Sequence, residues 1–171
     1  MRHVFLYASL VLLGSGYATL SRAETVINIH GKVTANPCTV DADTVDKQID
    51  LGTFYRSQLT TAGQGSDWND FSLLLTQCPV STTSATVTFS GTADTDDATA
   101  FKNSGDAANV ALRLSSADHA TTYSNGGSMK VTIDASTKKA TFPPSARIFT
   151  PKGGAGAGSF NSVLNVDFTY E

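Results

Sequence analysis

Two cysteines and two of the histidines are the side chains of this 171-residue chain with the most obvious potential to bind a metal or to react. Cys38 and Cys78 stand far apart in the sequence, and neither has a cysteine, His30 or His119 at the short spacing typical of a zinc site. Two thiols in an exported protein favour a disulfide. We therefore expect Cys38 to pair with Cys78, and we expect no metal and no other cofactor.

The remaining reactive side chains do not form a recognisable catalytic set. An enzymatic nucleophile needs a base within hydrogen-bond reach, but His30 lies in a strand-like tail and His119 in a polar loop. The aspartates at 94, 96 and 97 resemble the start of a calcium loop, yet the sixth position is Thr99 instead of glycine. The glycine-rich run 153–158 lacks the spacing of a phosphate-binding loop. The sequence thus predicts a protein that is not an enzyme.

The single tryptophan, Trp68, could also stack on a sugar ring. Its sequence neighbours supply no evident polar constellation to hold such a ligand. We expect Trp68 to be a partly buried packing residue.

The N-terminus has the three parts of a secretory signal: a basic start, the apolar run 4–13 and small residues ending at Ala23. The alternative, a retained membrane anchor, is disfavoured because the apolar run is short and glycine and serine interrupt it at 14–16. We expect residues 1–23 to be removed on export. Cleavage leaves 10 basic and 15 acidic residues, a charge of about −5, which disfavours nucleic acid as a partner.

Most of the chain alternates apolar and polar residues with a period of two, which is typical of strands that bury one face. Clusters rich in glycine, asparagine and serine separate these segments, so the pattern predicts an all-β sandwich or barrel. A helical turn is expected only around 66–71. Pro143 and Pro144 would remove ladder donors, so the chain should follow an edge or change sheets there. The alternating segments are 45–51, 71–75, 85–90, 110–114, 129–133, 142–149 and 164–170.

The same alternation occurs at both ends of the exported chain, in 25–33 and in 164–170. Two interpretations are open. The two segments could be the first and last strands of a closed sandwich, or the first could complete the sheet of another chain.

Several short motifs, in this order and at this spacing, resemble the pilin subunits of chaperone-usher fimbriae, most of all the small tip-adaptor pilins of type 1 fimbriae. They extend over essentially the whole exported chain. They are Val26 to Val33, Asn36-Pro37-Cys38-Thr39-Val40, Ile49-Asp50-Leu51-Gly52, Gln77-Cys78-Pro79, Thr88 to Asp94, Ala146-Arg147 and the penultimate Tyr170.

The resemblance implies an incomplete immunoglobulin-like sandwich that lacks its last strand and is completed by donor-strand exchange. Residues 24–36 would be the donor extension and 37–171 the pilin domain. Expected partners are a periplasmic chaperone, an outer-membrane usher and adjacent pilin or adhesin subunits of a surface fimbria that serves adhesion. The implied donor face is Thr25, Ile27, Ile29, Gly31 and Val33, and the implied acceptor edge is Leu164, Val166, Phe168 and Tyr170.

Other functions are compatible with the same composition. A major rod pilin shares the fold, the tail and the disulfide with an adaptor. An exported carbohydrate-binding sandwich is a further alternative from a different class, and it would not need the segment 24–36.

Overall fold

A computed structural model describes His30 and residues 36–171 of the chain. By backbone contacts the chain divides into two units, Met1–Lys32 and Val33–Glu171, and every described helix and strand lies in the second. The predicted signal peptide 1–23 and the predicted donor face lie outside the described residues. No helix within the described ranges is long and apolar enough to cross a membrane.

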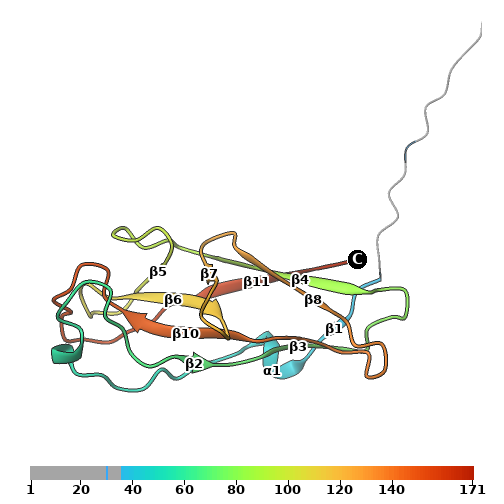
Figure 1. The fold of residues 1–171 in the computed structure, drawn as a ribbon, viewed down its shortest axis with the longest axis horizontal. Helices are drawn as coiled ribbons and strands as arrows, with labels where there is room; N and C mark the ends of the chain where they lie inside the picture. Colours follow the sequence, from blue (N-terminus) through green and yellow to red (C-terminus); the bar gives the residue numbers. More distant parts are fainter. Residues whose placement is uncertain (1–29, 31–35) are drawn as a thin grey trace, which may run out of the picture. The chain divides into compact units, whose positions relative to one another are not determined.

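The second unit is built from short strands, as the alternation predicted, with one short helix and one 3-10 turn (Figure 1). The helix α1 is Ala42–Val45 and the 3-10 turn is Arg56–Gln58. The strands are β1 Thr39–Val40, β2 Asn69–Asp70, β3 Leu73–Thr76, β4 Ser84–Gly91, β5 Phe101–Lys102, β6 Ala111–Ser116, β7 Thr122–Tyr123, β8 Ser128–Thr132, β9 Ala140–Phe142, β10 Pro144–Phe149 and β11 Leu164–Tyr170.

The strands form antiparallel sheets. One has the order β11-β4-β8, one has the order β2-β10-β6-β5 with β7 also paired to β6, and a small one has the order β1-β3-β9. In Figure 1, β4, β8 and β11 run along one side of the unit and β10, β2 and β3 along the other. The core lies between them.

The chain changes sheets at its proline pair, as predicted. β9 pairs with β3, whereas β10, which begins at Pro144, pairs with β6 and β2. Pro143 separates the two strands and belongs to neither. Proline lacks the N–H that a central ladder requires, so the pairing breaks where the prolines stand.

The core follows from strand alternation. In β4, Ala85, Val87 and Phe89 are buried, and their neighbours are half-buried. They belong to a cluster that also contains Leu75, Phe101, Leu114 and Phe142. A second, smaller cluster consists of Leu59, Val110, Ile148 and Ala155.

Two local predictions are wrong. The segment 45–51 is not a strand: Val45 ends α1, and residues 46–55 have extended or irregular backbone outside any strand. A segment becomes a strand only when a neighbour accepts and donates its ladder hydrogen bonds, and alternation alone does not supply that neighbour. The segment 66–71 does not form the expected helical turn. The backbone N–H of Ser66 donates a hydrogen bond to the carbonyl of Ile148, and β2 within this segment pairs with β10.

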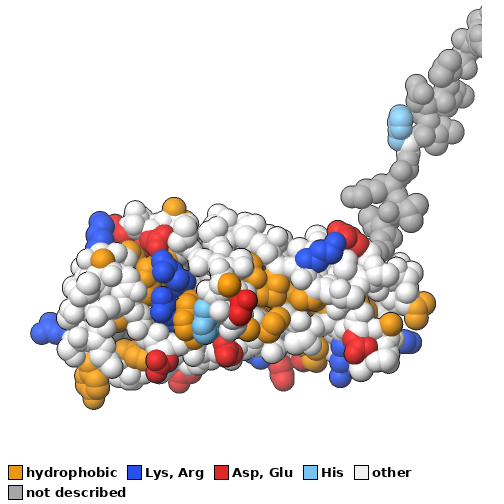
Figure 2. Space-filling model, in the orientation of Figure 1, with side chains coloured by type: hydrophobic (Ala, Val, Ile, Leu, Met, Phe, Trp, Pro, Cys, Tyr) orange, Lys and Arg blue, Asp and Glu red, His pale blue; other side chains and the backbone are white. Residues whose placement is uncertain are grey.

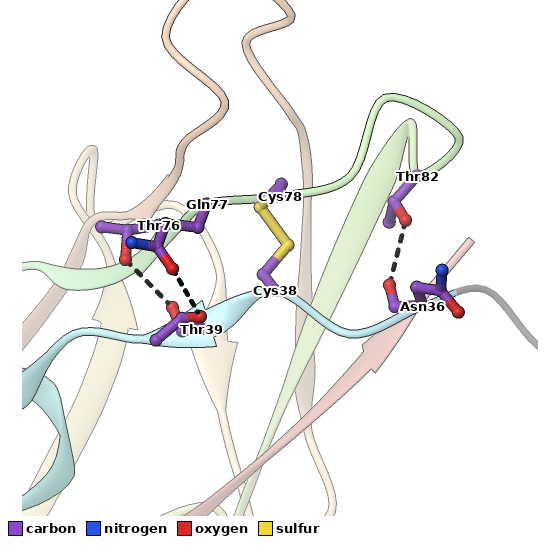
Figure 3. Close-up of a disulfide and its surroundings, with 7 residues drawn as sticks. All are labelled: Asn36, Cys38, Thr39, Thr76, Gln77, Cys78 and Thr82. Atoms are coloured by element: carbon purple, nitrogen blue, oxygen red, sulfur yellow. Dashed lines mark hydrogen bonds between the residues drawn. A yellow bond between two sulfur atoms is a disulfide. The ribbon is translucent and has the colours of Figure 1, made fainter.

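The predicted pairing of Cys38 with Cys78 is confirmed (Figure 3). The bridge ties the chain just before β1 to the chain just after β3. Beside it, the Thr82 hydroxyl donates to the carbonyl of Asn36 at 3.0 Å, and the Thr39 hydroxyl donates to the Gln77 side chain at 3.3 Å. The segment 36–39 is therefore held in place by a covalent bond and by hydrogen bonds.

Two turns depend on particular residues. Between β8 and β9 one carboxylate oxygen of Asp134 accepts hydrogen bonds from the Ser136 hydroxyl at 2.6 Å and from the backbone N–H groups of Ser136 and Thr137 at 2.8 and 3.1 Å. These bonds hold the pKa of Asp134 at about 2. After β10, Gly153 has φ +84°, and a Cβ there would lie 2.6 Å from the carbonyl oxygen of Thr60. Only glycine fits that position without strain.

Candidate binding groove

The last strand, β11, is the edge of its sheet. It pairs with β4 along its whole length, from Leu164 opposite Gly91 to Tyr170 opposite Ala85. On its other side, no strand of the described chain pairs with it. A sheet edge of this length presents unpaired N–H and C=O groups that can pair with another strand.

A groove of about 1060 Å³ lies beside this edge. The groove is lined by residues 44–56 from the first part of the described chain and by residues 155–162 and 164–166 from its last part. Apolar side chains from four strands also line it: Leu73 of β3, Phe89 of β4, Leu112 and Leu114 of β6, and Ala146 and Ile148 of β10. An apolar groove beside an open edge can accept an extended chain whose alternate side chains are apolar.

The predicted acceptor residues share one face of β11 but not one location. Leu164, Val166, Phe168 and Tyr170 are all half-buried, alternate with exposed residues and pack against the main core cluster. Only Leu164 and Val166 line the groove. Phe168 instead contacts Phe142, with ring centroids 5.5 Å apart, and burial raises the pKa of Tyr170. The groove therefore follows the first half of β11 and the chain that leads into it.

Side chains of both core clusters line the groove. Ile148 and Leu59, from the smaller cluster, line it together with Phe89 and Leu114 from the larger one. Half-buried Leu51 and Phe160 pack against both clusters. An inserted apolar strand would cover parts of both clusters, so it would stabilise the fold as well as occupy the groove.

The C-terminal end of β11 is fixed by polar contacts. The backbone N–H of Glu171 donates to the Ser84 carbonyl at 3.0 Å, and its side chain pairs with Lys130 at 2.5 Å. The hydrogen bond and charge of Lys130 lower the pKa of the Glu171 carboxyl. These contacts hold the strand in register on β4, and its outer edge has no partner strand within residues 36–171.

The other reactive residues named from the sequence are dispersed. In the 94–100 loop, Asp94 accepts hydrogen bonds from the backbone of Asp96 and Asp97, and Asp97 pairs with Arg113 at 2.6 Å. No group of three metal-ligating side chains occurs within the described ranges. The glycine-rich run 153–158 contributes to the groove wall through its last four residues, 155–158.

Trp68 is half-buried, as expected, but the expectation that it lacks polar neighbours is wrong. Its ring stacks on that of His119 with centroids 4.4 Å apart, and the guanidinium of Arg147 lies 4.5 Å from its centroid. These residues come from three separate parts of the chain, so their sequence positions gave no sign of the contact. Sequence reasoning also missed the groove residues Phe54, Leu59 and Phe160, which lie outside alternating segments.

Comparisons with known proteins agree with this architecture. The family described as Fimbrial protein matches residues 27–171. Protein FimG of Escherichia coli (strain K12) is 38% identical over 164 residues, which cover 96% of this chain and 95% of the relative.

Two solved structures share the fold. The P pilus rod subunit PapA superposes with a TM-score of 0.65 at 19% identity, covering 80% of this chain and all of PapA. A subunit of a chaperone-usher pilus gives 0.66, also at 19% identity, covering 90% of this chain and 99% of that subunit. The all-β fold expected from the sequence is therefore the fold of pilin subunits.

Proposed function

The chain belongs to the fimbrial protein family, and on that basis we propose that it is a minor adaptor near the fimbrial tip that links two neighbours by donor-strand exchange. Family membership makes it a non-catalytic structural subunit that assembles with other pilins into surface fimbriae, as the sequence predicted. The adaptor position, the mode of linkage and the residues involved are the proposal.

The observation that carries the proposal is the groove lined by apolar side chains beside the edge of β11 that pairs with no strand of the described chain. The outer edge of β11, which has no partner strand among residues 36–171, offers a generic hydrogen-bond ladder. The apolar side chains that line the groove, among them Leu112, Leu114 and Ile148, offer pockets for alternate residues of an incoming strand. Ladder and pockets together are the requirements of β-strand addition.

The strand that this chain donates is proposed to lie in residues 24–36. Its apolar face would be Thr25, Ile27, Ile29, Gly31 and Val33. Two inserted isoleucines contribute roughly 1.5 to 3 kcal/mol each when fully buried, in addition to the backbone ladder. A junction of that strength dissociates slowly, so the fibre resists shear without covalent links between subunits.

The same groove explains why assembly factors are needed. An exposed sheet edge beside apolar pockets is prone to aggregate. We therefore propose that residues 1–23 direct export, that a periplasmic chaperone covers the groove, and that an outer-membrane usher exchanges the chaperone strand for the tail of the next subunit.

A major rod subunit would use the same groove and tail, and it remains the second candidate. Resemblance to the tip-adaptor pilins favours the adaptor. Counting this subunit relative to the others in isolated fimbriae separates the two: an adaptor is present in very few copies per fibre, and a rod subunit is the most abundant component.

Paired substitutions on the two faces of the tail test the donor assignment. The pair Ile27→Asp and Ile29→Asp places two carboxylates on the proposed apolar face, and the pair Val26→Asp and Asn28→Asp places two on the opposite face. The first variant should still bind its chaperone but fail to join the preceding subunit, while the second should join it. The donor assignment is wrong if the first variant enters fibres at the normal rate.

A further inference from the structure

The surface of the β2-β10-β6-β5 sheet that faces away from the groove carries an unusual row of side chains. In β10, Ala146 and Ile148 line the groove, so Arg147 between them projects from the opposite face. Arg147 is directly opposite Arg113 of β6. β2 lies on the other side of β10, where Ser145 is opposite Asp70 and Ala146 is opposite Asn69. The next step in this register places Trp68 beside Arg147. The row is therefore Trp68, Arg147 and Arg113.

The two arginines differ in how their charge is balanced. Arg113 pairs with Asp97 at 2.6 Å, and its guanidinium lies 3.8 Å from the ring centroid of Phe149. Arg147 has no ion pair and no side-chain hydrogen bond among residues 36–171, and its Nε is buried without a partner. Burial and the charge of Arg113 lower the pKa of Arg147.

Like charges directly opposite each other in a sheet destabilise it. The cation–π contact with Trp68 offsets part of that cost but supplies no anion. Arg147 is thus a half-buried cation in a defined position, and no anion among residues 36–171 pairs with it. Such a group can bind an anionic partner.

The surroundings of Arg147 form a continuous patch. His119, in the turn between β6 and β7, stacks on Trp68 with 9° between the ring planes, and its Nε2 lies 3.9 Å from a carboxylate oxygen of Asp70. Figure 2 shows basic, hydrophobic and acidic side chains gathered around a histidine near the middle of the visible face. We call Trp68, Arg147, Arg113 and His119 the arginine–tryptophan patch.

We propose that the arginine–tryptophan patch docks an acidic surface of a neighbouring protein chain, with a carboxylate of that chain bound by Arg147. Small ligands bind in concave pockets, whereas the linings of the groove and of a second, smaller cavity at residues 54–67 include no side chain of the patch. Tryptophan and arginine on an open surface are instead the residues that most often dominate protein interfaces. The patch lies on the face opposite the groove, so both can be occupied at once.

The patch contains its own probe, because Trp68 is the only tryptophan of the chain. A saturating peptide of residues 24–36 first fills the groove of the chain. A hexaglutamate peptide is then titrated into this sample, and its binding is followed by Trp68 fluorescence and by isothermal titration calorimetry. Saturable binding is expected. Arg147→Gln should weaken it about tenfold, since a charge-assisted hydrogen bond is lost, and Arg147→Lys should weaken it less.

The matched control is Lys139→Gln, which removes one positive charge from an exposed position in the turn before β9. It should leave hexaglutamate affinity unchanged, and a hexaglutamine peptide should not bind. The proposal is overturned if hexaglutamate gives no saturable heat, if Arg147→Gln binds it as well as the original chain, or if inorganic sulfate or glucuronic acid binds at least as tightly. The last result would assign the patch to small anions or acidic sugars. Failure of these arms leaves the groove proposal untouched, because the groove is occupied throughout.

Discussion

Replacing Val166 by aspartate tests whether the groove is the binding site for a strand. Val166 is half-buried on the groove side of β11, whereas Thr169 is exposed on the opposite side of the same strand. Val166→Asp therefore places a carboxylate where an incoming apolar side chain would pack, and Thr169→Asp adds the same charge facing outward.

The size of the effect follows from what insertion buries. A valine contributes about 1.5 kcal/mol or more when a strand covers it fully, and a carboxylate at the same place must be desolvated or protonated. The loss in binding free energy should be at least about 2 kcal/mol, or about 30-fold in affinity. Thr169→Asp should change affinity by less than about threefold.

The assay measures fluorescence polarisation of a labelled peptide of residues 24–36 with each variant. Near-ultraviolet circular dichroism checks that both variants fold like the original chain. The reasoning is refuted if folded Val166→Asp binds the peptide as tightly as the original chain, or if both variants lose affinity equally.

Three further predictions concern the scaffold. Replacing both Cys38 and Cys78 by serine opens a link across 40 residues and should lower the free energy of unfolding by about 4 kcal/mol, measured by urea denaturation; an unchanged midpoint would contradict it. Gly154→Ala should lower the free energy of unfolding by about 1 kcal/mol, because Gly154 has a positive φ. Gly153→Ala should lower it by clearly more, because Gly153 also has a positive φ and its new Cβ would lie against backbone atoms. Equal losses in the two variants would contradict this. Asp134 has a pKa of about 2 in the folded chain, below its ordinary value of 3.8. Its contribution to the free energy of unfolding is therefore complete above pH 3.8 and is lost as the pH falls towards 2. Asp134→Asn should flatten that part of the plot of stability against pH, and parallel plots for the two chains would argue against it.

The sequence predicted the longer strands but missed the two-residue strands β1, β2, β5 and β7, which are too short to show alternation. β4 and β11 alternate in burial and lie where the pattern placed them, because each turns one face to the core; β6 also lies where predicted, although its burial does not alternate strictly. The change of sheet at Pro143 was also predictable, since the missing N–H of proline is a local property.

The site was predicted only in part. Leu164 and Val166 line the groove because alternation fixes which side of β11 they face. Phe168 and Tyr170 have the same pattern but lie past the groove, and strand period carries no information on where a groove ends. The irregular segment 46–55 was mistaken for a strand for a related reason: its alternation is real, but no neighbour in the described chain supplies a ladder.

The arginine–tryptophan patch was beyond the reach of sequence patterns. Trp68, His119 and Arg147 are separated by dozens of residues, and each is unremarkable in its own segment. They meet because β10 pairs with both β2 and β6, which is a property of the sheet order and not of any one strand.

The most direct test of a fold that lacks one strand is hydrogen exchange at β11 in a chain shortened to residues 36–171. About half of the β11 amides, those bonded to β4, should be protected, and the others should exchange rapidly because they face the open edge. Adding the peptide of residues 24–36 should protect the second set. Protection of all β11 amides before any peptide is added would show a sheet that is already closed, and it would contradict the account.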